Sequence, residues 1–193
     1  MGNVVVSEFI SLDGVIEDPG GAEGTDFGGW TFRFPAEDGQ QFKFGELMAS
    51  DVQLLGRVTY EDFAANWPAM EQATGDFGAK MNGMPKVVVT TTLSHPAWQN
   101  TTVASGDLPG VVAGLKKKYT GDILVAGSAT LVDGLCEHDL VDEYRLMLHP
   151  VVLGQGKRLF KDGSTPADLS LVDISKMGSD VLLLTYRPAK RPS

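Results

Sequence analysis

Short runs of β-branched and apolar residues alternate with helix-like segments through the first two thirds of the chain, and no other feature restricts its fold as much. The clearest strand is residues 86–91, which read Lys-Val-Val-Val-Thr-Thr. A helix is predicted from Asp107, a favoured N-cap residue, to the lysines at 116–118, which suit the negative end of a helix dipole. A strand at residues 123–126 and a helix at 129–136 follow. A strand, a helix and a strand in this order favour parallel pairing through a right-handed crossover.

The flanking segments extend this pattern and then change it. Further strands are predicted at residues 4–12 and 51–55, and further helices at 36–49, 59–66 and 76–83. In the last third, strands are predicted at residues 143–153, 169–175 and 180–187, with little helix between them. Residues 178–180, Gly-Ser-Asp, form a turn signal, so the last two strands should pair antiparallel. The sequence therefore predicts a single α/β domain over residues 1–193, with a mixed, mostly parallel sheet and antiparallel C-terminal strands.

Composition and charge argue against several kinds of partner. The 193 residues include 25 acidic and 16 basic ones, for a formal net charge of −9, which argues against nucleic acid because phosphate binding needs clustered Lys and Arg. No apolar run approaches the roughly 20 residues that span a bilayer. The N-terminal residues lack the basic-then-apolar pattern of a signal peptide. We therefore expect a cytoplasmic protein without a membrane partner.

Cysteine and histidine are too few and too scattered to suggest a disulfide or a metal site. Cys136 is the single cysteine, so no intrachain disulfide can form, which is consistent with a reducing compartment. His95, His138 and His149 have neither metal-ligand spacing nor a cysteine partner. We expect no metal in this protein.

A first candidate phosphate site lies at residues 55–61, Leu-Gly-Arg-Val-Thr-Tyr-Glu, where a predicted strand runs into a predicted helix. Free backbone N–H groups at a helix start and the guanidinium of Arg57 suit a phosphate, and Gly56 lets the backbone approach closely. The alternative is an ordinary strand-to-helix turn with Thr59 as its cap and Arg57 on the surface. The segment alone does not decide between the two.

Two further segments have the same ambiguity. Residues 125–131, Val-Ala-Gly-Ser-Ala-Thr-Leu, again lead from a strand into a helix through small residues, which permit a diphosphate to sit on the helix start. They match neither the dinucleotide-binding Gly-x-Gly-x-x-Gly pattern nor a P-loop, and a tight turn that needs a glycine explains them equally well. The threonines at 90–92 follow a strand whose carboxyl end is where ligands of α/β sheets normally bind. A β-branched strand end is the simpler interpretation of that run.

The order of these segments resembles that of the dihydrofolate reductase superfamily. A first strand ends in Ser-Leu-Asp-Gly at residues 11–14, and then Gly-Arg-x-Thr-Tyr-Glu, the threonine run and Gly-Ser-x-x-Leu follow. More closely, the chain is similar to the C-terminal reductase domain of the bifunctional deaminase/reductase of riboflavin biosynthesis. The characteristic stretch is residues 142–160, from Asp-Glu-Tyr-Arg-Leu through His-Pro-Val-Val-Leu-Gly to Leu-Phe. The resemblance extends from about residue 3 to residue 187 and implies a three-layer, dihydrofolate-reductase-like α/β fold.

The resemblance also implies NADPH as the cofactor and assigns residues to it. The positions that match phosphate contacts are Gly56, Arg57, Thr59, Gly127, Ser128, Ala129 and Leu131. The positions that match the surroundings of the adenosine ribose and its 2′-phosphate are Thr90 and Thr91, and those that match the nicotinamide pocket are Phe9 and Ile16. The usual Gly-Gly turn of the family is Gly127-Ser128 here, and because a serine fits a helix start we expect cofactor binding to survive.

On the substrate side the chain departs further from the family pattern. Dihydrofolate reductases carry a carboxylate on their first helix that hydrogen-bonds the pterin ring, and either Glu37 or Asp38 lies in the matching neighbourhood. Both are otherwise explained as helix N-terminal acids that the dipole stabilises. Trp30 either stacks on a flat heterocycle or pins the glycine-rich loop at 17–30 to the core. Asp13 either contacts cofactor or substrate or shapes the Asp-Gly turn.

Together these features predict an NADPH-dependent reductase of a small pterin or aminopyrimidine-type heterocycle, a riboflavin-type reductase-like protein. The alternatives are a true dihydrofolate reductase and a non-catalytic NADPH-binding protein. We expect the loop at 17–30 to close over the nicotinamide, with Trp30 near the substrate ring, and the alternative is an inert surface loop. Riboflavin-type relatives pair through their reductase domains, and the apolar residues at 181–184 suit an edge that a second copy covers. The alternative is that these strands pair within the chain, which the turn at 178–180 also permits. We therefore expect a homodimer.

Overall fold

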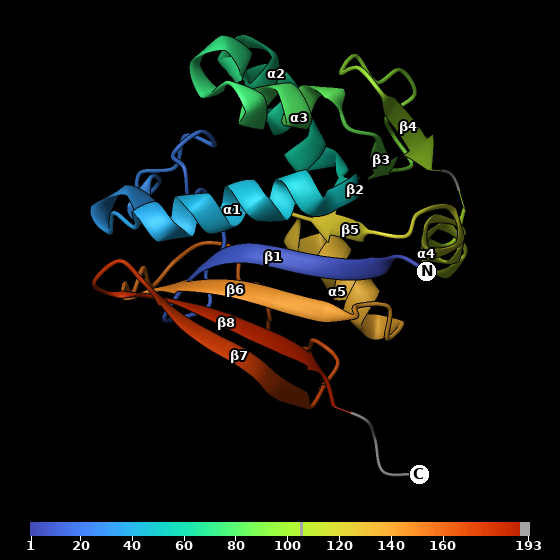
Figure 1. The fold of residues 1–193 in the computed structure, drawn as a ribbon. Helices are drawn as coiled ribbons and strands as arrows, with labels where there is room; N and C mark the ends of the chain where they lie inside the picture. The colour runs from blue at the N-terminus through green and yellow to red at the C-terminus, as the bar shows by residue number, and fades with distance from the viewer. Residues whose placement is uncertain (105, 190–193) are drawn as a thin grey trace.

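Eight strands form one continuous sheet in the computed structural model, which describes residues 1–104 and 106–189 (Figure 1). The strands are β1 (Asn3–Ser11), β2 (Ser50–Gly56), β3 (Lys86–Val89), β4 (Thr101–Ala104), β5 (Asp122–Val125), β6 (Glu143–His149), β7 (Leu169–Met177) and β8 (Val181–Pro188). Their order across the sheet is β4-β3-β2-β5-β1-β6-β8-β7. The strands from β4 to β6 in this order are parallel, whereas β8 pairs antiparallel with β6, and β7 with β8. The predicted mixed, mostly parallel sheet with antiparallel C-terminal strands is confirmed.

Helices cover both faces of the sheet. On one face lie α1 (Glu37–Ala49), α2 (Arg57–Thr74) and α3 (Asp76–Gly83), and on the other lie α4 (Leu108–Lys118) and α5 (Ala129–Glu137) (Figure 1). Because side chains alternate along a strand, Leu54 joins the core beneath α4 and α5 while its neighbour Leu55 joins the core beneath α1, α2 and α3. The result is the expected three-layer arrangement. In the described ranges, no helix is long and apolar enough to cross a membrane.

Strand β1 occupies the centre of the sheet, between β5 and β6. The chain leaves β1 through α1 on one face and crosses to β2, whereas α5 on the opposite face carries it from β5 to β6. In open α/β sheets, the place where such connections diverge leaves a crevice at the carboxyl ends of the strands, and ligands bind there. The carboxyl ends of β1, β2 and β5 therefore define the region where a site is expected.

The strands predicted at 86–91 and 143–153 are shorter in the structure, where β3 ends at Val89 and β6 at His149, and two further elements differ for identifiable reasons. The helix predicted at 59–66 is α2, which runs on to Thr74 with Pro68 inside it. Trp67 lies against Phe77 of α3 with 5.4 Å between ring centroids, and this packing offsets the backbone hydrogen bond that a helical proline removes. The sequence analysis did not predict β4, which is four residues long and gains its order by parallel pairing with β3.

The apolar residues at 181–184 do not form an edge of the sheet. They belong to β8, which is paired on both sides, with β6 and with β7. The prediction of an exposed edge at these residues is therefore wrong, because the hairpin with β7 covers them within the chain. The outer edge is the nine-residue β7, where Leu171, Val172 and Ile174 are 53%, 48% and 54% exposed. An edge strand with exposed apolar side chains is a surface that proteins normally cover.

We expect a second copy of the chain to cover β7 and form a homodimer. Ile174→Lys should convert the dimer to a monomer in sedimentation velocity at micromolar concentration, because an unpaired charge is costly to bury in an interface. Met70→Lys, at an exposed position of α2, is the matched control and should leave the assembly unchanged. A wild-type chain that sediments as a monomer under the same conditions would contradict this expectation.

Candidate functional site

Two strand-to-helix turns touch each other at the carboxyl edge of the sheet. One leads from β2 into α2 at Gly56, and the other leads from β5 into α5 through Gly127 and Ser128. Because β2 and β5 are parallel neighbours, both turns emerge at the same edge. A Cβ atom on Gly56 would lie 2.2 Å from the Oγ of Ser128, and one on Gly127 would lie 3.0 Å from the Cγ2 of Thr59. This contact leaves no room for a side chain at position 56, so the position requires glycine.

The backbone of the second turn is unusual. Gly127 has φ +82° and Ser128 has φ +70°, both in the left-handed region. The Oγ of Ser128 accepts a hydrogen bond from the N–H of Leu131 at 3.3 Å and so caps α5. Gly56, which precedes α2, offers no side-chain cap. The first turns of both helices thus present backbone N–H groups at one edge, which is the arrangement that binds anions.

The remaining residues assigned to cofactor phosphates surround the first turn. Strand β3 pairs with β2 up to Gly56, so the threonines that follow β3 lie beside the Gly56 turn. The Oγ1 of Thr90 accepts hydrogen bonds from the N–H groups of Thr92 and Leu93, at 3.1 and 3.2 Å, and Thr91 is exposed. Arg57 is also exposed, and its guanidinium lies 2.7 Å from the carboxylate of Glu61. Arg57 and Thr91 lie on the surface, where they can turn toward an anion without disturbing the core.

Asp13 ties the end of β1 to the segment after β6. Its carboxylate accepts hydrogen bonds from the hydroxyl of Ser11 at 2.7 Å and from the backbone N–H groups of Leu153 and Gly154, at 3.1 and 2.8 Å. Burial alone would raise the pKa of Asp13, but these hydrogen bonds outweigh it and lower the pKa to about 2. Asp13 is therefore ionised and holds the end of β1 against the segment at 153–154, which fits the alternative that Asp13 shapes the turn after β1.

Trp30 holds the loop at 17–30 against the core. It begins the short 3-10 helix η1 (Trp30–Arg33), it is completely buried, and its ring lies edge-on to His149 with 5.3 Å between centroids. Its Nε1 donates a hydrogen bond to the carbonyl of Glu17 at 2.9 Å. The buried carboxylate of Asp18 accepts hydrogen bonds from the N–H groups of Glu23 and Thr25, both at 2.9 Å. A ring without exposed surface cannot stack on a bound heterocycle unless the loop rearranges.

Glu37 and Asp38 lie in the first turn of α1 and both are exposed. The Oδ1 of Asp38 accepts hydrogen bonds from the N–H groups of Gly39 and Gly178, at 3.0 and 2.8 Å, and so joins α1 to the turn between β7 and β8. These contacts correspond to the helix N-terminal role that the sequence left open as the alternative. Neither Glu37 nor Asp38 is therefore the buried carboxylate that would bind a pterin ring.

Sequence reasoning missed the carboxylate that α1 does bury. Glu46 is 7% exposed and accepts a hydrogen bond from the hydroxyl of Ser7 on β1 at 2.8 Å. It also lies 3.1 Å from the ammonium of Lys43 and 3.3 Å from the guanidinium of Arg145. The spacing of Lys43 and Glu46, three residues apart on one helix face, was the available signal. Glu46 is a carboxylate fully engaged by cations.

Sequence reasoning also missed Glu8, the one acidic residue within the apolar run of β1. Its side chain is 6% exposed, and its Oε1 accepts a hydrogen bond from the N–H of Gly127 at 2.8 Å. Burial raises the pKa of this carboxyl to about 8. A protonated acid therefore lies directly beneath the second glycine turn.

The two residues assigned to the nicotinamide pocket lie on opposite faces of the sheet. Phe9 is half-buried on the α1 face, with its ring 5.9 Å from that of His149. Ile16 is buried in the core beneath α4 and α5. The structure brings both to the end of β1 but does not bring them into one cluster. Among residues 1–104 and 106–189, no three His, Cys, Asp or Glu side chains are grouped to hold a metal ion.

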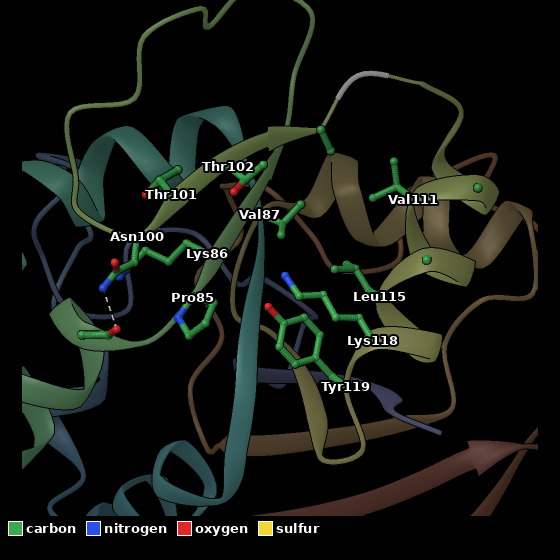
Figure 2. Close-up of a pocket in the computed structure, with 14 residues that line it drawn as sticks. Pro85, Lys86, Val87, Asn100, Thr101, Thr102, Val111, Leu115, Lys118 and Tyr119 are labelled. Atoms are coloured by element: carbon green, nitrogen blue, oxygen red, sulfur yellow. Dashed lines mark hydrogen bonds between the residues drawn. The ribbon is translucent and has the colours of Figure 1, made fainter.

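Two surface hollows lie near the sheet. The larger, of about 670 Å³, lies between α4 and the strands β3 and β4, with Lys118 and Tyr119 projecting into it (Figure 2). None of the predicted cofactor residues lines that hollow. The smaller, of about 420 Å³, adjoins the start of α5 and is lined by Ala129, Thr130, Gly156, Lys157, Arg158, Lys161 and Asp162. It adds basic side chains to the positive end of the α5 dipole.

A family model supports the resemblance noted from the sequence. The model of the RibD C-terminal domain matches residues 3–183. Two proteins of Bacillus subtilis (strain 168), both described as uncharacterized, also match. YwjB is 28% identical over 177 residues, which cover 90% of this chain and 91% of that protein. YyaP is 42% identical over 72 residues, which cover 37% of this chain and 38% of that protein.

Solved structures of related proteins have the same fold. A protein of Shewanella sp. PV-4, provisionally assigned to riboflavin biosynthesis, superposes with a TM-score of 0.76 at 20% identity, over 97% of this chain and 99% of that one. A pyrimidine reductase-like protein of Corynebacterium diphtheriae superposes with a TM-score of 0.66 at 12% identity, over 98% of this chain and 93% of that one. The deaminase/reductase of Thermotoga maritima superposes with a TM-score of 0.64 at 16% identity, over 97% of this chain and 57% of that one. At these identities the superpositions establish the fold.

Gly56→Ala tests whether the contact between the two turns is required. The added Cβ would meet the Oγ and the Cβ of Ser128 at 2.2 and 2.7 Å, so one turn must move. We expect the free energy of unfolding, measured by urea denaturation, to fall by about 1–3 kcal/mol, as for other overpacked positions.

Two further variants make this test specific. Ser128→Gly removes both atoms that the new Cβ meets, so Gly56→Ala should cost clearly less in that background. Gly45→Ala, in α1 with open space around it, is the control and should stabilise the protein by about 0.5–1 kcal/mol. An undiminished cost of Gly56→Ala in the Ser128→Gly background would show that the contact is not the cause.

Proposed function

The chain belongs to the RibD C-terminal domain family, and on that premise we propose that it is an NADPH-dependent reductase of a small nitrogen heterocycle of the pterin or aminopyrimidine class. The observation that carries this proposal is the contact between the Gly56 and Gly127 turns at the carboxyl edge of the sheet. The functions described for the structural neighbours also support a reductase of a nitrogen heterocycle. They include a pyrimidine reductase-like protein and a 5-amino-6-(5-phosphoribosylamino)uracil reductase.

The residues present at the two turns fit a phosphorylated dinucleotide. Because Gly56 and Gly127 have no side chains, Ser128 and Thr59 occupy the space that their Cβ atoms would fill, and the two turns pack closely enough for both helix starts to face one diphosphate. The starts of α2 and α5 supply N–H groups and positive dipole ends to that diphosphate. Arg57 is exposed, and it would exchange its ion pair with Glu61 for the 2′-phosphate, with hydroxyls of Thr90 and Thr91 beside it. NADPH bound in this way would supply the hydride.

The chain itself then has to position the substrate and exclude water. Asp13 fixes the segment at 153–154 to the end of β1, so that the crevice keeps its shape. The loop at 17–30, pinned by Trp30 and Asp18, forms an ordered wall next to β1. The described residues include no activated nucleophile at this edge, which suits a hydride transfer that depends on positioning.

Two rival functions make different demands on the site. A true dihydrofolate reductase needs a buried carboxylate that is free to bind a pterin, whereas Glu46 is engaged by Ser7, Lys43 and Arg145. This engagement favours the pyrimidine-type reductase. A non-catalytic NADPH-binding protein would use the same two glycine turns but would turn over no substrate.

We expect NADPH to bind more tightly than NADH, measured as two dissociation constants at one salt concentration. Arg57→Ala should weaken NADPH by about 1.5–3 kcal/mol, the range for hydrogen bonds to charged groups, and should leave NADH nearly unaffected. Lys117→Ala removes an equal charge from an exposed position of α4 and is the control. Equal affinities for NADPH and NADH would contradict the assignment of Arg57 and the threonines.

We expect the purified protein to oxidise NADPH in the presence of an aminopyrimidine or pterin, followed by the loss of reduced-nicotinamide absorbance. Dihydrofolate belongs in the panel, because its turnover in preference to the others would identify a dihydrofolate reductase instead. Tight NADPH binding without oxidation by any compound of the panel would support the non-catalytic alternative. The Gly56→Ala variant, in which the cofactor turn is displaced, should lose activity and NADPH binding together.

A further inference from the structure

The connection between β3 and β4, residues 90–100, joins two neighbouring parallel strands without a helix of its own. Parallel strands are usually joined by a helix, which packs its apolar side on the sheet. In this connection two single side chains take that part on the face of α2 and α3. Trp98 is buried there, and Leu93 packs against the same cluster of buried residues. The position of the connection therefore depends on how these two residues are held.

Trp98 is held by hydrogen bonds from both its backbone and its side chain. Its N–H donates to the hydroxyl of Tyr60 at 3.0 Å, and its indole Nε1 donates to the Oδ1 of Asn82 at 2.7 Å. The ammonium of Lys86 lies 4.1 Å from the centroid of its ring and donates to the carbonyls of Asn82 and Met84, both at 2.8 Å. Because these side chains are buried, losing one of them would leave polar groups unpaired away from water.

Tyr60 connects this arrangement to the proposed cofactor site. It lies in the first turn of α2, three residues after Arg57, so its hydroxyl ties the connection to the helix turn that carries the guanidinium. At the other end of the connection, β3 pairs with β2 in a register that puts Val89 opposite Gly56. Thr90 and Arg57 directly follow these two residues and are therefore neighbours across the sheet edge.

A short series of contacts leads from Trp98 back to the threonines. Leu93 packs in the same core as Tyr60 and Trp98. The N–H of Leu93 donates to the Oγ1 of Thr90 at 3.2 Å, and the N–H of Thr92 donates to the same oxygen at 3.1 Å. The turn at 90–92 is therefore fixed by β3 on one side and by the buried part of the connection on the other.

We infer that Tyr60 is a positioning residue for the choice between NADPH and NADH, an inference that rests on the proposed function. Its hydroxyl holds Trp98, and the connection then keeps Thr90 and Thr91 in a fixed place beside Arg57. These are the side chains to which we assign the 2′-phosphate. NADPH and NADH differ only in that phosphate, so a displaced connection should weaken NADPH and spare NADH.

Tyr60→Phe removes the hydroxyl and keeps the ring, so it tests this hydrogen bond alone. We expect the dissociation constant for NADPH to rise about threefold to tenfold, the equivalent of one hydrogen bond, and that for NADH to change by less than about twofold. Hydrogen exchange measured by mass spectrometry should become faster in the peptide that covers residues 90–99, because the N–H of Trp98 loses its acceptor.

Two further variants separate positioning from a general loss of stability. In an Arg57→Ala background, Tyr60→Phe should weaken NADPH by less than about twofold more, because the groups that the connection aligns are no longer complete. Leu47→Val trims a buried side chain that α1 contributes to the same core, and it is the matched control. It should lower the free energy of unfolding but leave the ratio of the two dissociation constants unchanged.

Trp98→Phe removes the hydrogen bond to Asn82 and keeps the one to Tyr60, so it provides a second measurement if Tyr60→Phe does not fold. It should shift the ratio in the same direction. If wild-type protein prefers NADPH and the variants keep that preference, or lose NADPH and NADH equally, the inference is overturned while the cofactor assignment stands. If wild-type protein binds NADPH and NADH equally, the cofactor assignment fails and the inference about Tyr60 fails with it.

Discussion

Gly56 and Ser128 touch at the carboxyl edge of the sheet, and the arrangement of the proposed site depends on that contact. Parallel pairing of β2 with β5 brings the two turns to one edge, and the missing side chain of Gly56 leaves room for the hydroxyl of Ser128. The same hydroxyl caps α5, so one atom fixes both the helix start and the approach of the two turns. With a larger side chain at Gly56, the two helix starts could not converge on one anion.

A buried acid lies on each face of β1, and the two acids have different hydrogen-bond and ion-pair partners. On the α1 face, Glu46 lies in a network with Ser7, Lys43 and Arg145, so its desolvation is offset by cations and a hydroxyl. On the α5 face, Glu8 has one backbone N–H as its hydrogen-bond partner, and it avoids the cost of a buried charge by keeping its proton. The two buried acids on opposite faces of β1 therefore differ in their partners: cations and a hydroxyl contact Glu46, whereas one backbone N–H contacts Glu8.

The glycine-rich loop at 17–30 is ordered by specific contacts. A Cβ on Gly28 would lie 2.1 Å from the carboxylate of Asp18, so this glycine serves close packing around a buried acid. Trp30 closes the loop with a hydrogen bond to Glu17 and an edge-on contact with His149. Any closure that brought Trp30 onto a substrate would first have to remove a fully buried ring from the core, which is energetically costly.

The alternation of strands and helices, the antiparallel C-terminal strands and the two glycine turns are predictable from the amino-acid sequence, because β-branched runs, helix starts and turn glycines are local signals. The order of those signals also supports the family resemblance. The packed fold was needed to show that α1 buries Glu46 rather than Glu37 or Asp38, and that the edge of the sheet is β7 rather than β8. It also decided that Glu8 meets Gly127, a residue 119 positions away. The reason is physical: desolvation and edge exposure depend on every group packed around a side chain, and most of those groups are distant in sequence.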